Sequence, residues 1–131
     1  MEFELTWIDS SRVVCRTSGK ALAKDYAALL RALTSSPEFG PEVRVLMDFR
    51  ALDVSSVTAT DMEKIASLRA RLASEGNFSS AMVVGPGALK YGLGRMFQSF
   101  ATAQTEIEIS IFETLDEAMA WLQADDAEPA P

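Results

Sequence analysis

The sequence predicts a single α/β domain, with a five-stranded mixed sheet and about four helices. Strand-like apolar segments alternate along the chain with segments whose apolar residues recur every three or four positions, as they do in helices. This alternation predicts a largely parallel sheet with right-handed crossovers. The first two strand-like segments are instead joined by a short polar turn, which adds an N-terminal hairpin. The 131 residues fit one domain.

The hairpin is predicted from the alternation of apolar and polar residues over 2–7, which is the period of a half-buried strand. A turn signal at 9–11 and a second strand over 13–17 complete it, and Gly19 is expected to end that strand. A helix over 20–33 should follow. Its predicted apolar face consists of Leu22, Tyr26, Leu29, Leu30 and Leu33.

The central unit is a strand, a loop and a helix. Residues 43–49 are nearly continuously apolar, as expected of a strand covered on both faces, and a polar turn should follow Phe49. The second helix is predicted to begin at Thr60, because Thr60 and Glu63 have the spacing of a capping box. The crevice beyond such a strand is a common ligand site, and a helix start favours anions. The buried stripe of the helix should consist of Met62, Ile65, Leu68 and Leu72.

The last units follow the same pattern. A buried strand over 80–84 ends at the turn 85–87, and a helix over 88–104 comes next. Isoleucines alternate with polar residues over 107–111, which is typical of a strand at a sheet edge, and this edge could pair with a second copy in a homodimer. Thr114, three residues before a glutamate, begins the last helix.

Composition excludes several classes of function. The net charge of −7 argues against nucleic acid as a partner. Histidine is absent, so we expect no enzyme activity, no metal site and no cofactor. The one cysteine, Cys15, is predicted to be a buried small hydrophobe.

The same features predict where the protein resides. The lone cysteine favours a reducing compartment, and no signal-peptide pattern or membrane span is present, so a cytoplasmic location is expected. Peripheral membrane contact stays open. The domain is expected to occupy 1–123, and the acidic, proline-containing tail 124–131 to be disordered.

Four pieces of the chain together suggest a family. They are the hairpin from Trp7 to Gly19, the strand from Val43 to Asp48, Arg95-Met96-Phe97 in the third helix, and Phe112 with Glu117-Ala118 and Trp121-Leu122. This set, which extends over nearly the whole chain, resembles the SpoIIAA-like proteins, which share the STAS fold of anti-sigma-factor antagonists. That family is similar in fold to the CRAL-TRIO lipid-transfer domains. The resemblance therefore implies apolar-ligand binding or protein interaction.

The resemblance also implies a switch site between the central strand and the second helix. STAS antagonists carry an Asp-Ser-Ser-Gly-Leu-like loop, in which one serine is phosphorylated at the start of a helix. Residues 53–60 stand at this place but lack the glycine, and Thr58 falls nearest the acceptor position. Ser55, Ser56 and Thr58 are therefore the candidate phospho-switch. In the alternative interpretation they are turn formers and helix caps.

The third helix predicts an apolar ligand slot against the second helix. Gly92 and Gly94 weaken this helix by roughly 1 kcal/mol each relative to alanine. Its Met and Phe residues are more numerous than a helix needs to cover the sheet. The glycines would serve either close packing or the hinge of a lid. The candidate ligand-binding residues are Met62, Ile65, Lys90, Tyr91, Leu93, Arg95, Met96, Phe97 and Phe100.

Two functions follow from these patterns. The leading hypothesis is a non-enzymatic binding module whose slot holds a small amphipathic or lipid-like ligand, with its anionic head near Lys90 or Arg95. The alternative is a protein-interaction switch of the anti-sigma-factor-antagonist type. The turn 85–87 has the outline of a phosphate cradle, but a simple turn is the better interpretation. Asp48 and Asp53 are expected to bind the following loop rather than a metal.

Overall fold

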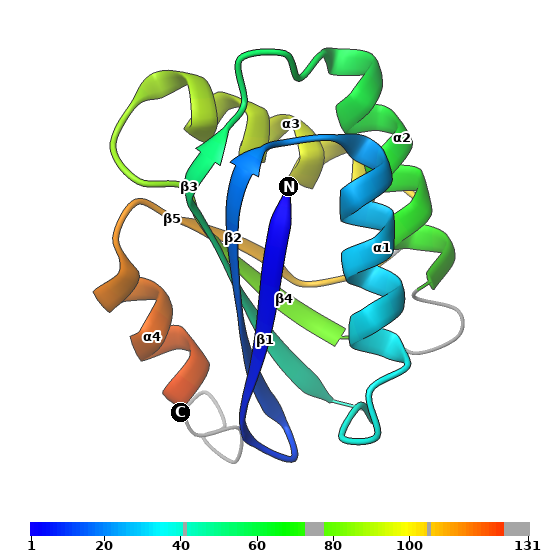
Figure 1. The fold of residues 1–131 in the computed structure, drawn as a ribbon, viewed down its shortest axis with the longest axis vertical. Coiled ribbons are helices and arrows are strands. Elements are labelled where there is room, and N and C mark those ends of the chain that lie inside the picture. The colour runs from blue at the N-terminus through cyan, green and yellow to red at the C-terminus, as the bar shows by residue number, and fades with distance from the viewer. Residues whose placement is uncertain (41, 73–77, 105, 125–131) are drawn as a thin grey trace.

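The sheet has the predicted mixed topology. The computed structural model describes residues 1–40, 42–72, 78–104 and 106–124. Five strands pair in the order β1-β2-β3-β4-β5, with β1 and β2 antiparallel and the later pairs parallel (Figure 1). The strands are β1 (Glu2–Asp9), β2 (Arg12–Lys20), β3 (Val43–Asp53), β4 (Phe78–Val83) and β5 (Ile109–Phe112).

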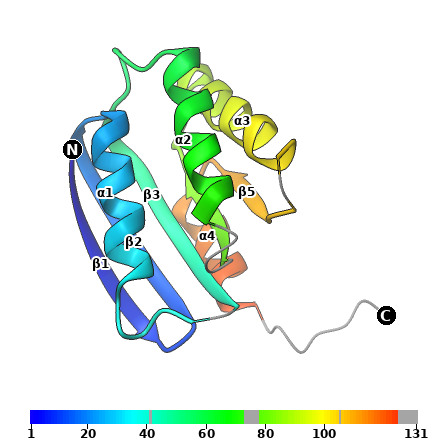
Figure 2. The ribbon, with the colours of Figure 1, turned by 90° about the vertical axis from the view of Figure 1, so that its right-hand side faces the viewer.

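Helices cover both faces of this sheet. Three helices pack on one face and a fourth on the other, within the part of the chain that the structure describes (Figures 1 and 2). They are α1 (Ala23–Thr34), α2 (Ala59–Leu72), α3 (Ala88–Thr102) and, on the second face, α4 (Leu115–Gln123). The tail predicted to be disordered lies, from residue 125 onward, outside the described residues.

Two cores form because successive strand residues face opposite sides. Cys15 belongs to the larger core under α1, α2 and α3, whereas its neighbour Val14 packs under α4 with Leu46 and Val83. The prediction that Cys15 is buried is confirmed, since its side chain is fully covered. Burial, with the nearby charge of Asp48, raises the pKa of this thiol to about 12, so it stays protonated at neutral pH.

Two strands are longer than the sequence predicts. A register shift between Arg16 and Ser18 lets the end of β2 pair with residues 51–53 of β3. The prediction that Gly19 ends β2 is therefore wrong, and so is the polar turn expected directly after Phe49. Because β2 extends to residue 20, α1 begins later than predicted, and Leu22 precedes it with 38% of its surface exposed.

The N-terminal cap of α2 also differs from the prediction. Thr58 and Asp61 form the capping box, not Thr60 and Glu63. The amide of Asp61 donates to Thr58 Oγ1 at 3.1 Å, and the amide of Thr58 donates to Asp61 Oδ2 at 3.0 Å. The helix begins at residue 59, so Thr58 occupies the capping position. For α4 the predicted box is confirmed, since Thr114 accepts from the amide of Glu117.

The fifth strand lies at the sheet edge, as predicted, and its isoleucines are on the face that α3 covers. β5 begins at Ile109, so Ile107 precedes it. Ile109 is buried, and a Cβ placed on Gly94 of α3 would lie 3.3 Å from Ile111 Cδ1. Pairing of this edge in a homodimer stays a prediction.

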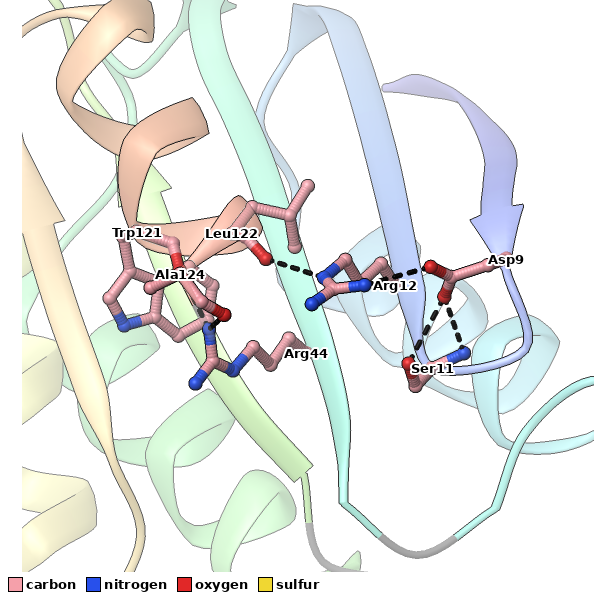
Figure 3. Close-up of polar contacts among 7 residues, drawn as sticks. All are labelled: Asp9, Ser11, Arg12, Arg44, Trp121, Leu122 and Ala124. Carbon is pink, nitrogen blue, oxygen red and sulfur yellow. Dashed lines mark hydrogen bonds and ion pairs between the residues drawn. The ribbon is translucent and has the colours of Figure 1, made fainter. Parts of the chain in front are cut away.

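The C-terminal end of α4 is held by two arginines from neighbouring strands (Figure 3). Arg12 Nε donates to the carbonyl of Leu122 at 2.8 Å, and Arg44 Nη1 donates to those of Trp121 and Ala124 at 2.8 and 3.0 Å. Arg12 and Arg44 are register partners in the sheet. They donate to carbonyls at the helix end, of which that of Trp121 also accepts from the amide of Ala124, and their charge suits that end of the helix dipole.

Candidate functional site

An apolar cavity lies where β3 and β4 end and the helices α1, α2 and α3 meet. Its volume is about 90 Å³. Three aromatic rings form part of its lining, and Tyr26 contacts the other two: its ring centroid lies 6.0 Å from that of Phe97 and 6.5 Å from that of Phe49. Leu22 and Val57 line it nearer the surface. This is the carboxyl edge of the parallel strands, where ligands commonly bind in α/β sheets.

A more open, polar groove adjoins this cavity. It has a volume of about 390 Å³, and its lining contains the charged residues Arg50, Asp53 and Lys90 among apolar side chains and the turn 85–87. Leu52, Val54, Val84 and Lys90 line both the groove and the apolar cavity. The two spaces are therefore neighbours, and the charged side chains of Arg50, Asp53 and Lys90 line the groove.

The cations of the groove are held in place by contacts with β3. Arg50 Nε and Nη2 donate to the two carboxylate oxygens of Asp48, each at 2.9 Å. This pairing lowers the pKa of Asp48 against the opposing effect of its burial. Lys90 Nζ, from the start of α3, donates to the carbonyls of Phe49 and Arg50 at 3.2 and 2.8 Å.

The groove also contains a carboxylate, that of Asp53. Its Oδ1 accepts from the amide of Ser55 at 3.0 Å. Hydrogen bonds from Ser55, aided by the charges of Lys20 and Lys90, lower the pKa of Asp53. Asp48 and Asp53 thus each bind nearby chain, as the sequence predicts. The groove presents both signs of charge at neutral pH.

The turn 85–87 leads from β4 into α3 and lines the groove. Gly85 and Gly87 have φ values of 78° and 125°, a region that other residues rarely adopt. Gly87 is also the N-cap of α3 and provides no side-chain oxygen for the first amides of the helix.

The predicted ligand residues fall into two groups. Met62, Lys90, Leu93 and Phe97 line the apolar cavity. The others lie outside the linings of both spaces: Tyr91 and Arg95 are exposed, Met96 is half-buried, and Ile65 and Phe100 pack on the larger core. The space found here is therefore bounded by α1 as well as by α2 and α3. A role of any of these residues in binding stays a prediction.

The candidate phospho-switch residues lie in the segment between β3 and α2. Ser55 and Ser56 are exposed. Thr58 is exposed as well, but its hydroxyl caps α2. Ser55 also lines the groove. The three hydroxyls thus border the same carboxyl edge as the cavity.

Sequence reasoning missed one unusual residue, Arg69 of α2. Its side chain is fully buried. The guanidinium carbon lies 3.6 Å from the ring centroid of Phe78, and Nη2 donates to the carbonyl of Phe78. Nε and Nη1 have no hydrogen-bond partner among the residues that the structure describes. Burial lowers the pKa of Arg69. The signal in the sequence is its position within the predicted apolar stripe, seven residues after Met62 and four after Ile65.

Comparison with known proteins places the chain in a family. The SpoIIAA-like family model matches residues 12–123. A crystal structure of an uncharacterized protein from Shewanella loihica PV-4, which has a SpoIIAA-like fold, is similar with a TM-score of 0.58 and 25% identity over 92% of each chain.

A second solved structure, of the anti-sigma factor antagonist SpoIIAA in its unphosphorylated form, has a TM-score of 0.50 and 16% identity, covering 93% of this chain and 96% of that one. This likeness concerns the fold. No curated protein matches the chain significantly. Among the described helices, none combines the length and the apolar character needed to cross a membrane. Since the family model matches most of its length, the chain belongs to the SpoIIAA-like family.

Proposed function

We propose that this protein is a non-enzymatic binding domain that holds a small amphipathic ligand at the carboxyl edge of β3 and β4. The apolar part of the ligand would fill the cavity beside Tyr26 and Phe97, and its anionic group would lie in the groove. The observation that carries the proposal is the adjacency of the two spaces, which share Lys90 and three apolar residues. Such a combination of apolar lining and few polar groups is typical of ligand sites.

The charges of the groove refine the expected position of the anionic group. Lys90 keeps the role predicted from the sequence, whereas Arg95 is exposed on α3 and lines neither space. Arg50, which lines the groove and is oriented by Asp48, takes the second cationic position in the proposal. A non-enzymatic role is supported by the lack of histidine and by the protonated, buried thiol of Cys15.

Native mass spectrometry of the purified protein, followed by thermal unfolding with carboxylates of increasing chain length, tests the proposal. A ligand present at 100 times its Kd stabilises the fold by about 2.7 kcal/mol, which raises Tm measurably. Val57→Phe places a larger side chain in the mouth of the cavity and should abolish the shift. Ile8→Phe, which enlarges an exposed apolar side chain of β1 that lines neither space, is the matched control. No copurifying ligand and no shift with any compound would refute the proposal.

A second function is a protein-interaction switch. The observation that favours it is the exposure of Ser55 and Ser56 beside the groove, together with the likeness in fold to a protein described as an anti-sigma factor antagonist. Thr58 is the weaker acceptor, because phosphate on its hydroxyl would stand against the carboxylate of Asp61 within the capping box.

Phosphoproteomics with affinity capture distinguishes the two functions. Phosphate on Ser55 or Ser56, with a kinase-like partner that binds the wild type but not Ser56→Asp, would support the switch. Unmodified protein that captures no partner, yet shows the thermal shift described above, would refute it. A cytoplasmic location stays a prediction that fractionation can check.

A further inference from the structure

The apolar cavity is small for a lipid chain. An engineered apolar cavity of about 150 Å³ accommodates benzene, which is roughly 25 Å³ for each carbon atom. By that measure a cavity of about 90 Å³ takes about four carbon atoms. Tyr26 and Phe97 line it and are themselves buried, so a longer chain would have to displace packed rings. The cavity therefore suits a short, branched group rather than a fatty acyl chain.

The groove beside it is not a simple anion site. Arg50 and Lys90 supply two cations, but Asp53 supplies a carboxylate that lines the same groove. All three are held by contacts with neighbouring chain atoms: Arg50 by Asp48, Lys90 by two carbonyls and Asp53 by the amide of Ser55. A lone anionic head would gain from the cations and be repelled by the carboxylate.

These two features together select a class of ligand. We propose that the site binds a zwitterion with a short apolar branch, of the class of free branched-chain α-amino acids. The branch enters the cavity, the carboxylate of the ligand lies toward Arg50 and Lys90, and its ammonium group pairs with Asp53. This inference rests on the proposed function, because it uses the same cavity and groove, and it names their occupant.

Unused hydrogen-bonding capacity supports the assignment. An ammonium group has three donors, and the carbonyls of Phe49 and Arg50 take two of those on Lys90 within the described part of the chain. The Asp53 carboxylate has about four acceptor positions, of which Ser55 takes up to two through its hydroxyl and its amide. The first amides of α3 begin at the groove, and Gly87 caps them with no side chain. The site thus retains donors for a carboxylate and acceptors for an ammonium group.

Titration calorimetry with four compounds tests the inference. Leucine carries all three features, 4-methylpentanoate lacks the ammonium group, 3-methylbutylamine lacks the carboxylate, and alanine lacks the branch. We expect leucine to bind at least about tenfold more tightly than each of the others, because two of them lose a charge-assisted hydrogen bond and alanine loses the burial of the apolar branch.

Two variants separate the charge from the cavity. Asp53→Asn keeps an oxygen for the amide of Ser55 but removes the negative charge, so it should weaken leucine about tenfold and leave 4-methylpentanoate equal or tighter. Val57→Phe should abolish binding of both, whereas Ile8→Phe, at an exposed position of β1 that lines neither space, should bind as the wild type does. Thermal unfolding of each variant without ligand checks that it is folded.

The outcomes distinguish this inference from the proposal beneath it. If 4-methylpentanoate or a longer carboxylate binds as tightly as leucine and Asp53→Asn does not change binding, the assignment of a zwitterionic ligand is wrong. The proposed site for an amphipathic ligand is then still supported. If neither the four compounds nor longer carboxylates bind, both are wrong. Tighter binding of leucine that Asp53→Asn removes and Ile8→Phe preserves supports both proposals.

Discussion

Arginines on the two faces of the sheet have different surroundings. Under α4, Arg12 and Arg44 donate to carbonyls at the helix end and stay partly exposed. Under the other three helices, Arg69 is fully buried and two of its nitrogens have no partner among the described residues. The α4 face is thus closely packed with its helix end capped, whereas the other face contains both a desolvated cation and a cavity. The difference indicates that packing under α1, α2 and α3 is not optimised for stability alone.

Replacement of Arg69 should give the largest effect on stability. Methionine keeps much of the apolar stem and adapts to irregular spaces, but it removes a charge that is expensive to desolvate. We expect Arg69→Met to raise the free energy of unfolding by about 1–3 kcal/mol, measured by urea denaturation.

Lys64→Met, at an exposed position of the same helix, is the control and should change stability by less than about 0.5 kcal/mol. A loss of stability in Arg69→Met would show that ring stacking and the bond to the Phe78 carbonyl outweigh the cost of desolvation. The contrast between the two faces would then disappear.

On the α4 face, removal of an arginine should have the opposite sign. Arg12→Ala leaves the carbonyl of Leu122 without this donor and breaks the ion pair with Asp9, in which the two side chains lie 2.9 Å apart. We expect a loss of about 1–2 kcal/mol, because hydrogen bonds to charged groups contribute somewhat more than neutral ones.

Hydrogen exchange of the α4 amides should also accelerate in Arg12→Ala. Arg16→Ala, exposed on the same strand, should change stability by less than about 0.5 kcal/mol. Equal effects of the two substitutions would mean that the hydrogen bond from Arg12 to the end of α4 makes no specific contribution to stability.

Most of the fold could be predicted from sequence because periodicity reports burial directly. The alternation over 2–7 and the apolar run over 43–49 each correspond to observed strands, and the Thr114 cap is where its spacing predicts. Strand ends were less predictable. The register shift after Arg16 depends on pairing with β3, and no local pattern encodes a pairing between distant segments.

The candidate site was predictable in part. Lys90 and Phe97 line the cavity, and their place follows from a helix that begins at the carboxyl edge of the sheet. Arg50 could not be foreseen, because it lies where a turn was expected and the strand continues. Asp53 lay within the loop that the family resemblance marked, but only its position beside Lys90 shows that the groove holds both signs of charge. Burial of Arg69 depends on tertiary packing against Phe78.

The two glycines of α3 provide a smaller test of packing on the face that contains the cavity. A Cβ at Gly92 would meet no atom within 4 Å, whereas one at Gly94 would approach Ile111 and Val84. Gly92→Ala should therefore stabilise the protein by about 0.5–1 kcal/mol, the difference in helix propensity. Gly94→Ala gains the same propensity but must move Ile111, so it should be less stable than Gly92→Ala by about 1 kcal/mol or more. Equal stabilisation by both would mean that α3 is loosely packed at Gly94. A lid hinge at these glycines requires such loose packing.

The smallest effect is expected from the ion pair between Asp48 and Arg50. The pKa of Asp48 is lowered in the folded state. Asp48 therefore contributes stability above its unfolded pKa of about 3.9, and this contribution is lost as the pH falls through the lower, folded pKa. Asp48→Asn should therefore cost less than about 1 kcal/mol at pH 7, because water reaches the Arg50 side chain, which is 45% exposed.

Urea denaturation of the wild type and Asp48→Asn at several pH values measures this difference. It should stay constant from pH 7 down to about pH 5 and shrink below about pH 4. A difference of several kcal/mol would mean that Asp48 and Arg50 are desolvated as Arg69 is. The groove lined by Arg50 would then be less open to water than the exposure of that side chain indicates.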